Sequence, residues 1–156
     1  MRVSICAVGR LRAGPEHVLI SDYLQRFDRT GRALGLGPAK IVEVEDKKGG
    51  GMAAEADLLA RAIPAGALVV ALDERGRVQS SPEFAADLAG WRDGGRQDLA
   101  FVIGGADGIL PALRDRADQS LSFGRMVWPH MLVRVMLSEQ LYRAASILSG
   151  APYHRV

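Results

Sequence analysis

The clearest chemical signal in the sequence is a glycine-rich turn that directly follows an apolar run. Residues 101–108 read Phe-Val-Ile-Gly-Gly-Ala-Asp-Gly, so a buried strand is expected to lead into a turn with three glycines. Glycine allows backbone to approach a ligand closely, and open α/β sheets bind ligands at the carboxyl ends of their strands. The spacing fits neither the dinucleotide fingerprint nor a P-loop. The turn therefore predicts a ligand site of another kind or, alternatively, a purely structural turn.

Two further segments carry recognition chemistry. Residues 121–130 read Leu-Ser-Phe-Gly-Arg-Met-Val-Trp-Pro-His, and the proline keeps the peptide before it extended or turned, which leaves backbone groups free for a ligand. Near the end of the chain, Tyr153, His154 and Arg155 are consecutive side chains that can stack, titrate and bind phosphate. Tails are usually frayed, but this composition favours a functional role.

Other kinds of site have weaker support. Asp73 and Glu74 follow an apolar run as adjacent carboxylates, and we interpret one as a turn cap and the other as solvated. The three histidines show no metal-ligand spacing and Cys6 lies in a presumed core strand, so we expect no metal site. A serine nucleophile is also unsupported, because no Gly-x-Ser-x-Gly elbow occurs.

The elements that must position these residues alternate between strands and helices. Short, apolar, β-branched runs predict strands over residues 3–8, 41–44, 67–72 and 99–103. Helical periodicity and capping residues predict helices over residues 15–27, 53–63 and 81–91, a short one from about Pro111 to before Ser120, and one over 131–148. This alternation indicates an α/β fold with a largely parallel sheet and right-handed crossovers.

The helix predicted over residues 131–148 is apolar around most of its circumference. A helix of this kind is buried on more than one side. In so small a domain, we expect its second apolar side to face another subunit, with Leu137 or Leu141 pointing outward.

Composition limits the class of protein. The chain has 156 residues, of which 48% are hydrophobic and 24% charged, so wholesale disorder is excluded and residues 1–156 are expected to form one domain. No apolar run is long enough to span a bilayer, and no convincing signal peptide opens the chain. With Cys6 as the only cysteine, we expect a cytoplasmic protein without disulfides or membrane contact.

Positive charge gathers towards the C-terminus. The formal net charge is only +2, but residues 123–156 carry +3 and residues 1–122 carry −1. The arginine excess as a whole is explained by a GC-rich coding sequence at least as well as by function. Its C-terminal clustering is harder to explain in that way and suggests an anionic partner.

Several of these motifs, in this order, resemble one known family. Ile-Gly-Gly-x-x-Gly from Ile103, Phe-x-x-Met-x-Trp-Pro-His from Phe123, then Arg134-Val, Glu139-Gln, Leu-Tyr-Arg-Ala and a final Tyr-His-Arg are similar to the ribosomal RNA large-subunit pseudouridine N3-methyltransferases of the SPOUT superfamily. The similarity extends over the whole chain. It implies an α/β domain with a C-terminal trefoil knot, S-adenosylmethionine as methyl donor, 23S ribosomal RNA in the ribosome as substrate, and a homodimer with sites at its interface.

The resemblance also implies site residues. The cofactor positions carried over from the family are Leu72, Gly104, Phe123, Gly124, Arg125, Met126, Val127 and Trp128. Gly124-Arg125 stands where Ser-Lys is frequent in the family; backbone contacts would survive this change, whereas a side-chain role at either position would not.

Candidates for catalysis or RNA contact are His130, Arg134, Tyr153, His154 and Arg155, without assigned roles. The reaction needs loss of an imide proton, for which His130 or His154 is a candidate by pKa range and an arginine could stabilise the anionic ring. The tail residues could also complete the RNA side of the partner subunit's site.

Two other classes of function compete with this one. A non-catalytic ribosome-binding module could share the same fold, and methyl transfer would discriminate. A flavodoxin-like protein is disfavoured, because residues 8–11 offer only one glycine and no Ser or Thr to cradle phosphate.

Overall fold

The computed structural model describes residues 1–155 as an α/β fold built on one five-stranded sheet. The strands lie in the order β2-β1-β4-β3-β5, and each pairing is parallel. In chain order the elements are β1 (Arg2–Val8), α1 (Pro15–Gly31), the 3-10 turn η1 (Arg32–Leu34), β2 (Ala39–Val44), α2 (Gly51–Ala62), β3 (Leu68–Val78), α3 (Ser81–Asp93), β4 (Asp98–Ile103), α4 (Pro111–Arg116), β5 (Gln119–Ser122) and α5 (His130–Ser149). The α/β class with a largely parallel sheet is confirmed.

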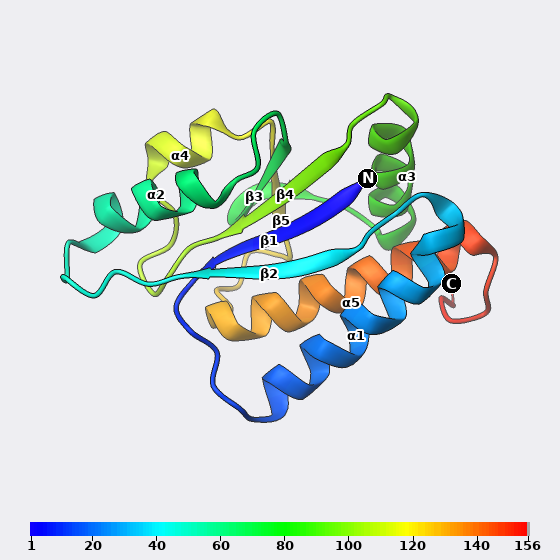
Figure 1. The fold of residues 1–156 in the computed structure, drawn as a ribbon, viewed down its shortest axis with the longest axis horizontal. Helices are drawn as coiled ribbons and strands as arrows, with labels where there is room; N and C mark the ends of the chain where they lie inside the picture. Colours follow the sequence, from blue (N-terminus) through cyan, green and yellow to red (C-terminus); the bar gives the residue numbers. More distant parts are fainter. Residues whose placement is uncertain (156) are drawn as a thin grey trace.

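Helices cover both faces of the sheet (Figure 1). α1, α3 and α5 pack on one face in a large core that contains Phe27, Leu88 and Leu141. α2 and α4 cover the other face, where Cys6 and Leu59 belong to a smaller core. β1 and β4 are central, and nearly all their residues are buried, which explains their continuous apolar sequences.

The sheet differs from the sequence prediction at one edge. β3 was expected to end at residue 72, but it continues to Val78 through a bulge, and β5 was not predicted. Leu121 of β5 pairs with Leu72 before the bulge and with Arg77 after it. A Cβ on Gly76 would lie 2.8 Å from the carbonyl carbon of Ser120, so the close approach of the two strands requires glycine there. The short fourth helix starts at Pro111 and ends at Arg116, before Ser120 as predicted.

The long helix α5 lies against the sheet and beside α1 (Figure 1). The expectation that Leu137 or Leu141 faces outward is wrong, because both are fully buried. The exposed apolar residues of α5 are Met131 and Leu132 in its first turn. The most exposed apolar surface of α5 therefore lies at its N-terminal end, next to the preceding loop.

Over residues 1–155, no helix is both long enough and apolar enough to cross a membrane. Whether the C-terminal segment is threaded into a knot stays a prediction.

Candidate functional site

A cavity of about 590 Å³ opens where β3, β4 and β5 end and α5 begins. Parallel α/β sheets commonly bind ligands at this edge. Most of the residues predicted from the sequence to bind the cofactor line this one cavity, together with a candidate catalytic residue: Leu72, Gly104, Phe123, Gly124, Met126, Val127, Trp128 and His130. Three regions far apart in sequence thus meet around one space. Arg125 is exposed and is not among the lining residues.

The glycine turn after β4 forms one wall. Gly104 is buried, and a Cβ there would lie 2.3 Å from the carbonyl oxygen of Gly108 and 2.8 Å from the amide nitrogen of Ile109. The turn is closed by a bridge between Gly105 and Gly108, whose amide donates to Gly105 O at 3.0 Å. The backbone is folded back on itself so tightly that only glycine fits at position 104.

The β3 bulge forms a second wall and is held by an acidic side chain. Asp73 accepts hydrogen bonds from the Arg75 amide at 2.9 Å and from Arg75 Nε at 3.0 Å. Burial alone would raise the pKa of Asp73, but these bonds from Arg75 and the nearby Arg114 charge outweigh it and hold the pKa below its ordinary value. Its interpretation as a turn cap with a solvated Glu74 neighbour agrees with this geometry.

The third wall, residues 123–130, is tied to the β3 bulge by a serine that sequence reasoning missed. Ser122 is 3% exposed, and its Oγ lies 3.0 Å from Glu74 O and 2.9 Å from Gly124 O, either of which can accept its proton. The same oxygen accepts the Gly124 amide at 3.0 Å. Only its place at the start of the Leu-Ser-Phe-Gly motif could have drawn attention to it.

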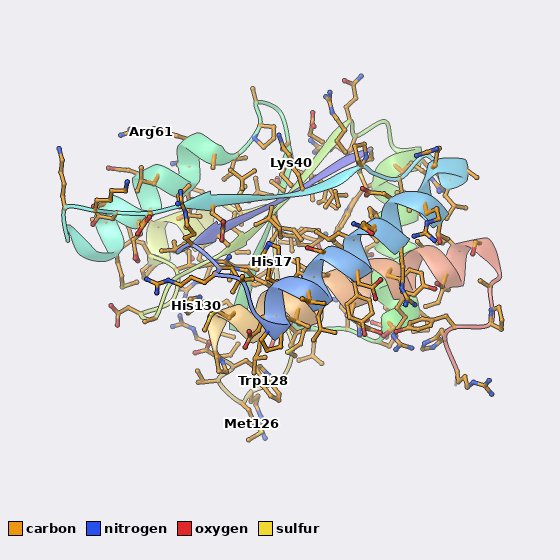
Figure 2. All side chains as sticks on the ribbon, turned by 60° about the horizontal axis from the view of Figure 1, so that its bottom comes forward. His17, Lys40, Arg61, Met126, Trp128 and His130 are labelled. Carbon is orange, nitrogen blue, oxygen red and sulfur yellow. The ribbon has the colours of Figure 1, made fainter. Side chains whose placement is uncertain are left out.

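This third wall exposes apolar side chains. Met126 is 74% exposed, Val127 79% and Trp128 41%. Figure 2 shows Met126 and Trp128 projecting from the lower edge of the molecule, near His130.

His130 begins α5 and faces the cavity as a neutral group. Burial, with a smaller contribution from the Arg134 charge, lowers the pKa of His130 below its ordinary value. Within residues 1–155, its Nδ1 is buried and has no hydrogen-bond partner. A neutral imidazole nitrogen without a protein partner can accept a proton.

Arg134 lies outside the cavity and is 1% exposed. Its Nη1 donates to Glu43 at 2.8 Å, and its Nη2 donates to Val8 O and Gly9 O at 2.8 Å each. In this chain Arg134 therefore ties α5 to the ends of β1 and β2 and does not reach the ligand space.

The tail also lies away from the cavity and docks on the second half of α5. Tyr153 donates to Glu139 at 3.0 Å, and its ring centroid lies 4.6 Å from that of Tyr142. The Arg143 guanidinium stacks 4.7 Å from the centroid of the Tyr153 ring. His154 Nδ1 lies 3.2 Å from Arg143 Nη1. Arg155 is exposed, so of the three tail residues it alone keeps its side chain free of these contacts.

Comparison with known proteins assigns the chain to a family. A family model described as "Predicted SPOUT methyltransferase" matches residues 1–154. The chain belongs to the SPOUT methyltransferase family. Among its relatives in this family are proteins named ribosomal RNA large subunit methyltransferase H from Ruegeria sp. strain TM1040, at 76% identity, and from Dinoroseobacter shibae, at 73%. Each match covers 100% of both chains.

Solved structures share the fold over most of the chain. A probable methyltransferase from Bordetella pertussis covers 92% of this chain and 95% of its own, with 18% identity and a TM-score of 0.53. A probable methylase family protein from Haemophilus influenzae covers 99% of this chain and 70% of its own, with 14% identity and a TM-score of 0.51. At these identities the likeness concerns the fold alone.

Proposed function

We propose that this protein is a single-domain enzyme of the cytoplasm that methylates N3 of a pseudouridine in 23S ribosomal RNA. It takes the methyl group from S-adenosylmethionine and acts as a homodimer on assembled ribosomes or large subunits. The observation that carries the proposal is the 76% identity, over the full length of both chains, to a protein named ribosomal RNA large subunit methyltransferase H.

The cavity suits the cofactor. Its volume, about 590 Å³, falls within the range of roughly 300–1,000 Å³ usual for small-molecule sites. One wall is backbone without side chains at Gly104 and Gly105, the β3 bulge supplies charged groups, and residues 123–130 supply apolar side chains on which an adenosine ring can rest. We assign cofactor contacts to Leu72, Gly104 and residues 123–128; at Arg125, which is exposed, the contact is through the backbone.

When bound, S-adenosylmethionine supplies an electrophilic methyl group, so the chain must align N3 with it and assist loss of the N3 proton. His130 is the histidine that lines the cavity; its pKa is lowered and its Nδ1 has no partner within residues 1–155, so we assign it as the group that takes the proton. Arg134 acts by positioning the start of α5. The geometry favours His130 over His154 as the base within one chain.

An apolar surface supports the homodimer. Val18 and Leu19 of α1, residues 126–128, and Met131 and Leu132 of α5 expose large apolar side chains. A groove lined by Leu19, Phe123 and Met136, among others, lies between α1, the segment before α5, and α5. A patch of this kind on a small protein marks an interface.

The dimer is tested by mass measurement in solution. Leu132→Asp places a charge in this surface and should yield monomers. Val78→Asp is the matched control, because Val78 is also exposed, at 64%, but lies at the end of β3. A monomeric wild-type protein at micromolar concentration contradicts the proposal.

For the tail, a role at the partner subunit's site fits better than one in its own chain. In its own chain Arg155 is exposed, whereas Tyr153 and His154 are held on α5. Removing residues 152–156 would release Tyr153 from Glu139 and Tyr142, so some loss of thermal stability is expected together with loss of methyl transfer. Full turnover by the truncated protein would contradict the role.

The function is tested with ribosomes from cells that lack the modification. Incubation with labelled S-adenosylmethionine should transfer label to 23S ribosomal RNA, and mapping should place it on N3 of one pseudouridine. A protein that binds ribosomes without transferring label would instead be a binding module. Label at another position would contradict methylation at N3 of a pseudouridine.

A further inference from the structure

Two arginines in the segment between β1 and α1 have no carboxylate partner. Arg10 and Arg12 are exposed, and neither forms an ion pair with any carboxylate among residues 1–155. Elsewhere, many arginines of the fold are paired: Arg2, Arg26, Arg75, Arg77, Arg92, Arg114, Arg134 and Arg143. Residues 9–14 contain no acidic side chain, so the segment carries two uncompensated positive charges.

The backbone that carries Arg10 is fixed from the protein interior. The amide of Gly9 donates to Val44 O at 2.8 Å, and Gly9 O accepts from the buried Arg134 at the same distance. On the other side, the amide of Leu11 donates to Glu43, the carboxylate that Arg134 pairs with. Since Glu43 is neutralised by Arg134, it does not cancel the charge of Arg10. The ion pair between buried Arg134 and Glu43 therefore holds this segment in a defined position.

That position is beside the candidate active site. A Cβ on Gly9 would lie 3.9 Å from Cε1 of His130, which lines the cavity. Figure 1 shows the blue segment between β1 and α1 running past the first turn of α5, where His130 is labelled in Figure 2. Arg10 follows Gly9 directly, and Arg12 is two residues further. Two free guanidinium groups thus belong to the segment that borders the His130 side of the cavity.

Guanidinium groups in this setting suit phosphate. The planar fork of arginine binds two phosphate oxygens at once, and an exposed, unpaired side chain loses no internal ion pair when it does so. Nucleic-acid phosphates flank any base that enters an enzyme cavity, and contacts to them fix orientation without reading sequence. The nearest acidic side chain in sequence, Glu16, lies beyond Gly14 on α1 and is not ion-paired to either arginine.

We propose that Arg10 and Arg12 bind backbone phosphates of the RNA next to the nucleotide that enters the cavity. This inference rests on the proposed function and names a surface through which the substrate is held. The arginines act on ribosome binding and not on the methyl donor, and Arg134 with Glu43 positions them.

The test compares two double variants that lose the same charge. Arg10→Ala/Arg12→Ala removes the proposed contacts. Arg29→Ala/Arg32→Ala is the control, because both side chains are exposed and outside the ion pairs of residues 1–155, yet they lie at the far end of α1. A 17-residue helix separates the two sites by about 25 Å.

Co-sedimentation with ribosomes lacking the modification measures binding over a range of salt concentrations, and needs no turnover. At about 100 mM salt, we expect Arg10→Ala/Arg12→Ala to bind at least tenfold more weakly than wild type. Its slope of log affinity against log salt should fall by roughly 1.4–1.8, since each lost phosphate contact contributes about 0.7–0.9. The control should stay close to wild type, and S-adenosylmethionine affinity by calorimetry should be unchanged in both.

Arg10→Lys/Arg12→Lys tests whether the effect is due to charge. This variant keeps both positive charges, so its slope of log affinity against log salt should be close to that of wild type. Equal slopes for Arg10→Ala/Arg12→Ala and the control would overturn the inference. So would a loss of cofactor affinity in Arg10→Ala/Arg12→Ala, which would place these arginines on the cofactor.

The proposed function fails separately from this inference. If wild type transfers no methyl group but the loss of slope is still specific to Arg10 and Arg12, methyl transfer is contradicted and the phosphate contact is supported.

Discussion

Replacing Gly104 by alanine tests whether the glycine turn is both rigid and part of the cofactor site. The new Cβ would lie 2.3 Å from Gly108 O and 2.4 Å from its carbonyl carbon. Ordinary contacts begin near 3.4 Å, so the backbone of residues 108 and 109 must move by about 1 Å. Because the obstacle is backbone and not a flexible side chain, we expect a cost in the upper part of the usual range for overpacking, about 2–3 kcal/mol.

Two measurements follow from this displacement. For a chain of this length each kcal/mol lowers Tm by roughly 2–4 °C, so Gly104→Ala should melt about 4–12 °C below wild type. The shifted turn also narrows the cavity, and calorimetry should show S-adenosylmethionine binding at least tenfold weaker, a loss of about 1.4 kcal/mol.

Gly90→Ala is the matched control for this experiment. Gly90 lies in α3, and a Cβ there meets nothing within 4 Å, so alanine should leave cofactor affinity unchanged and raise stability by about 0.5–1 kcal/mol. An unchanged Tm for Gly104→Ala would refute the rigid turn. A lower Tm with unchanged cofactor affinity would place the cofactor elsewhere.

Three shorter predictions concern other buried groups. Ser122→Ala leaves the Gly124 amide without its partner, so we expect a loss of about 1–3 kcal/mol in unfolding free energy and several-fold weaker cofactor binding by calorimetry; equal values to wild type would contradict the tie between the walls. Burial raises the pKa of Cys6 to about 11, so the folded thiol should resist alkylation at pH 8, and stability should fall more steeply in wild type than in Cys6→Ala as pH rises from about 9 to 11. Because the folded pKa of His130 is lowered, its NMR titration midpoint should lie below 6.5. The contribution of His130 to stability should be lost as pH falls from about 6.5 through that midpoint, and a midpoint above 6.5 would contradict its neutral state.

The sequence predicts the central strands well and the edge poorly, for a physical reason. β1 and β4 are buried on both faces, so each is a continuous apolar run that can be recognised as a strand from the sequence. β5 has four residues, two of them only partly buried, and exists because it pairs with β3 on both sides of a bulge. That pairing joins residues more than forty positions apart and leaves no local periodicity. The bulge itself reads as a polar turn.

The candidate site shows the same division. The glycine turn and residues 123–130 can be recognised from their residue types, and in the structure they line one cavity. Arg134 also stood out, but its role as the buried partner of Glu43 could not be derived, because Glu43 lies 91 residues away on a different element. Residues that position other residues are harder to recognise in a sequence than residues that contact a ligand.

The exposed third wall links cofactor binding to the proposed dimer. Met126, Val127 and Trp128 line the cavity and yet leave 74%, 79% and 41% of their surfaces in solvent. Apolar side chains this exposed bind a ligand weakly from one side, since a ligand resting on them stays open to water. A second chain packed against the same side chains would exclude that water and fix the loop, which is otherwise tied to the sheet mainly through Ser122. Cofactor binding and dimerisation would then draw on the same three side chains, and by linkage each would strengthen the other to the same degree.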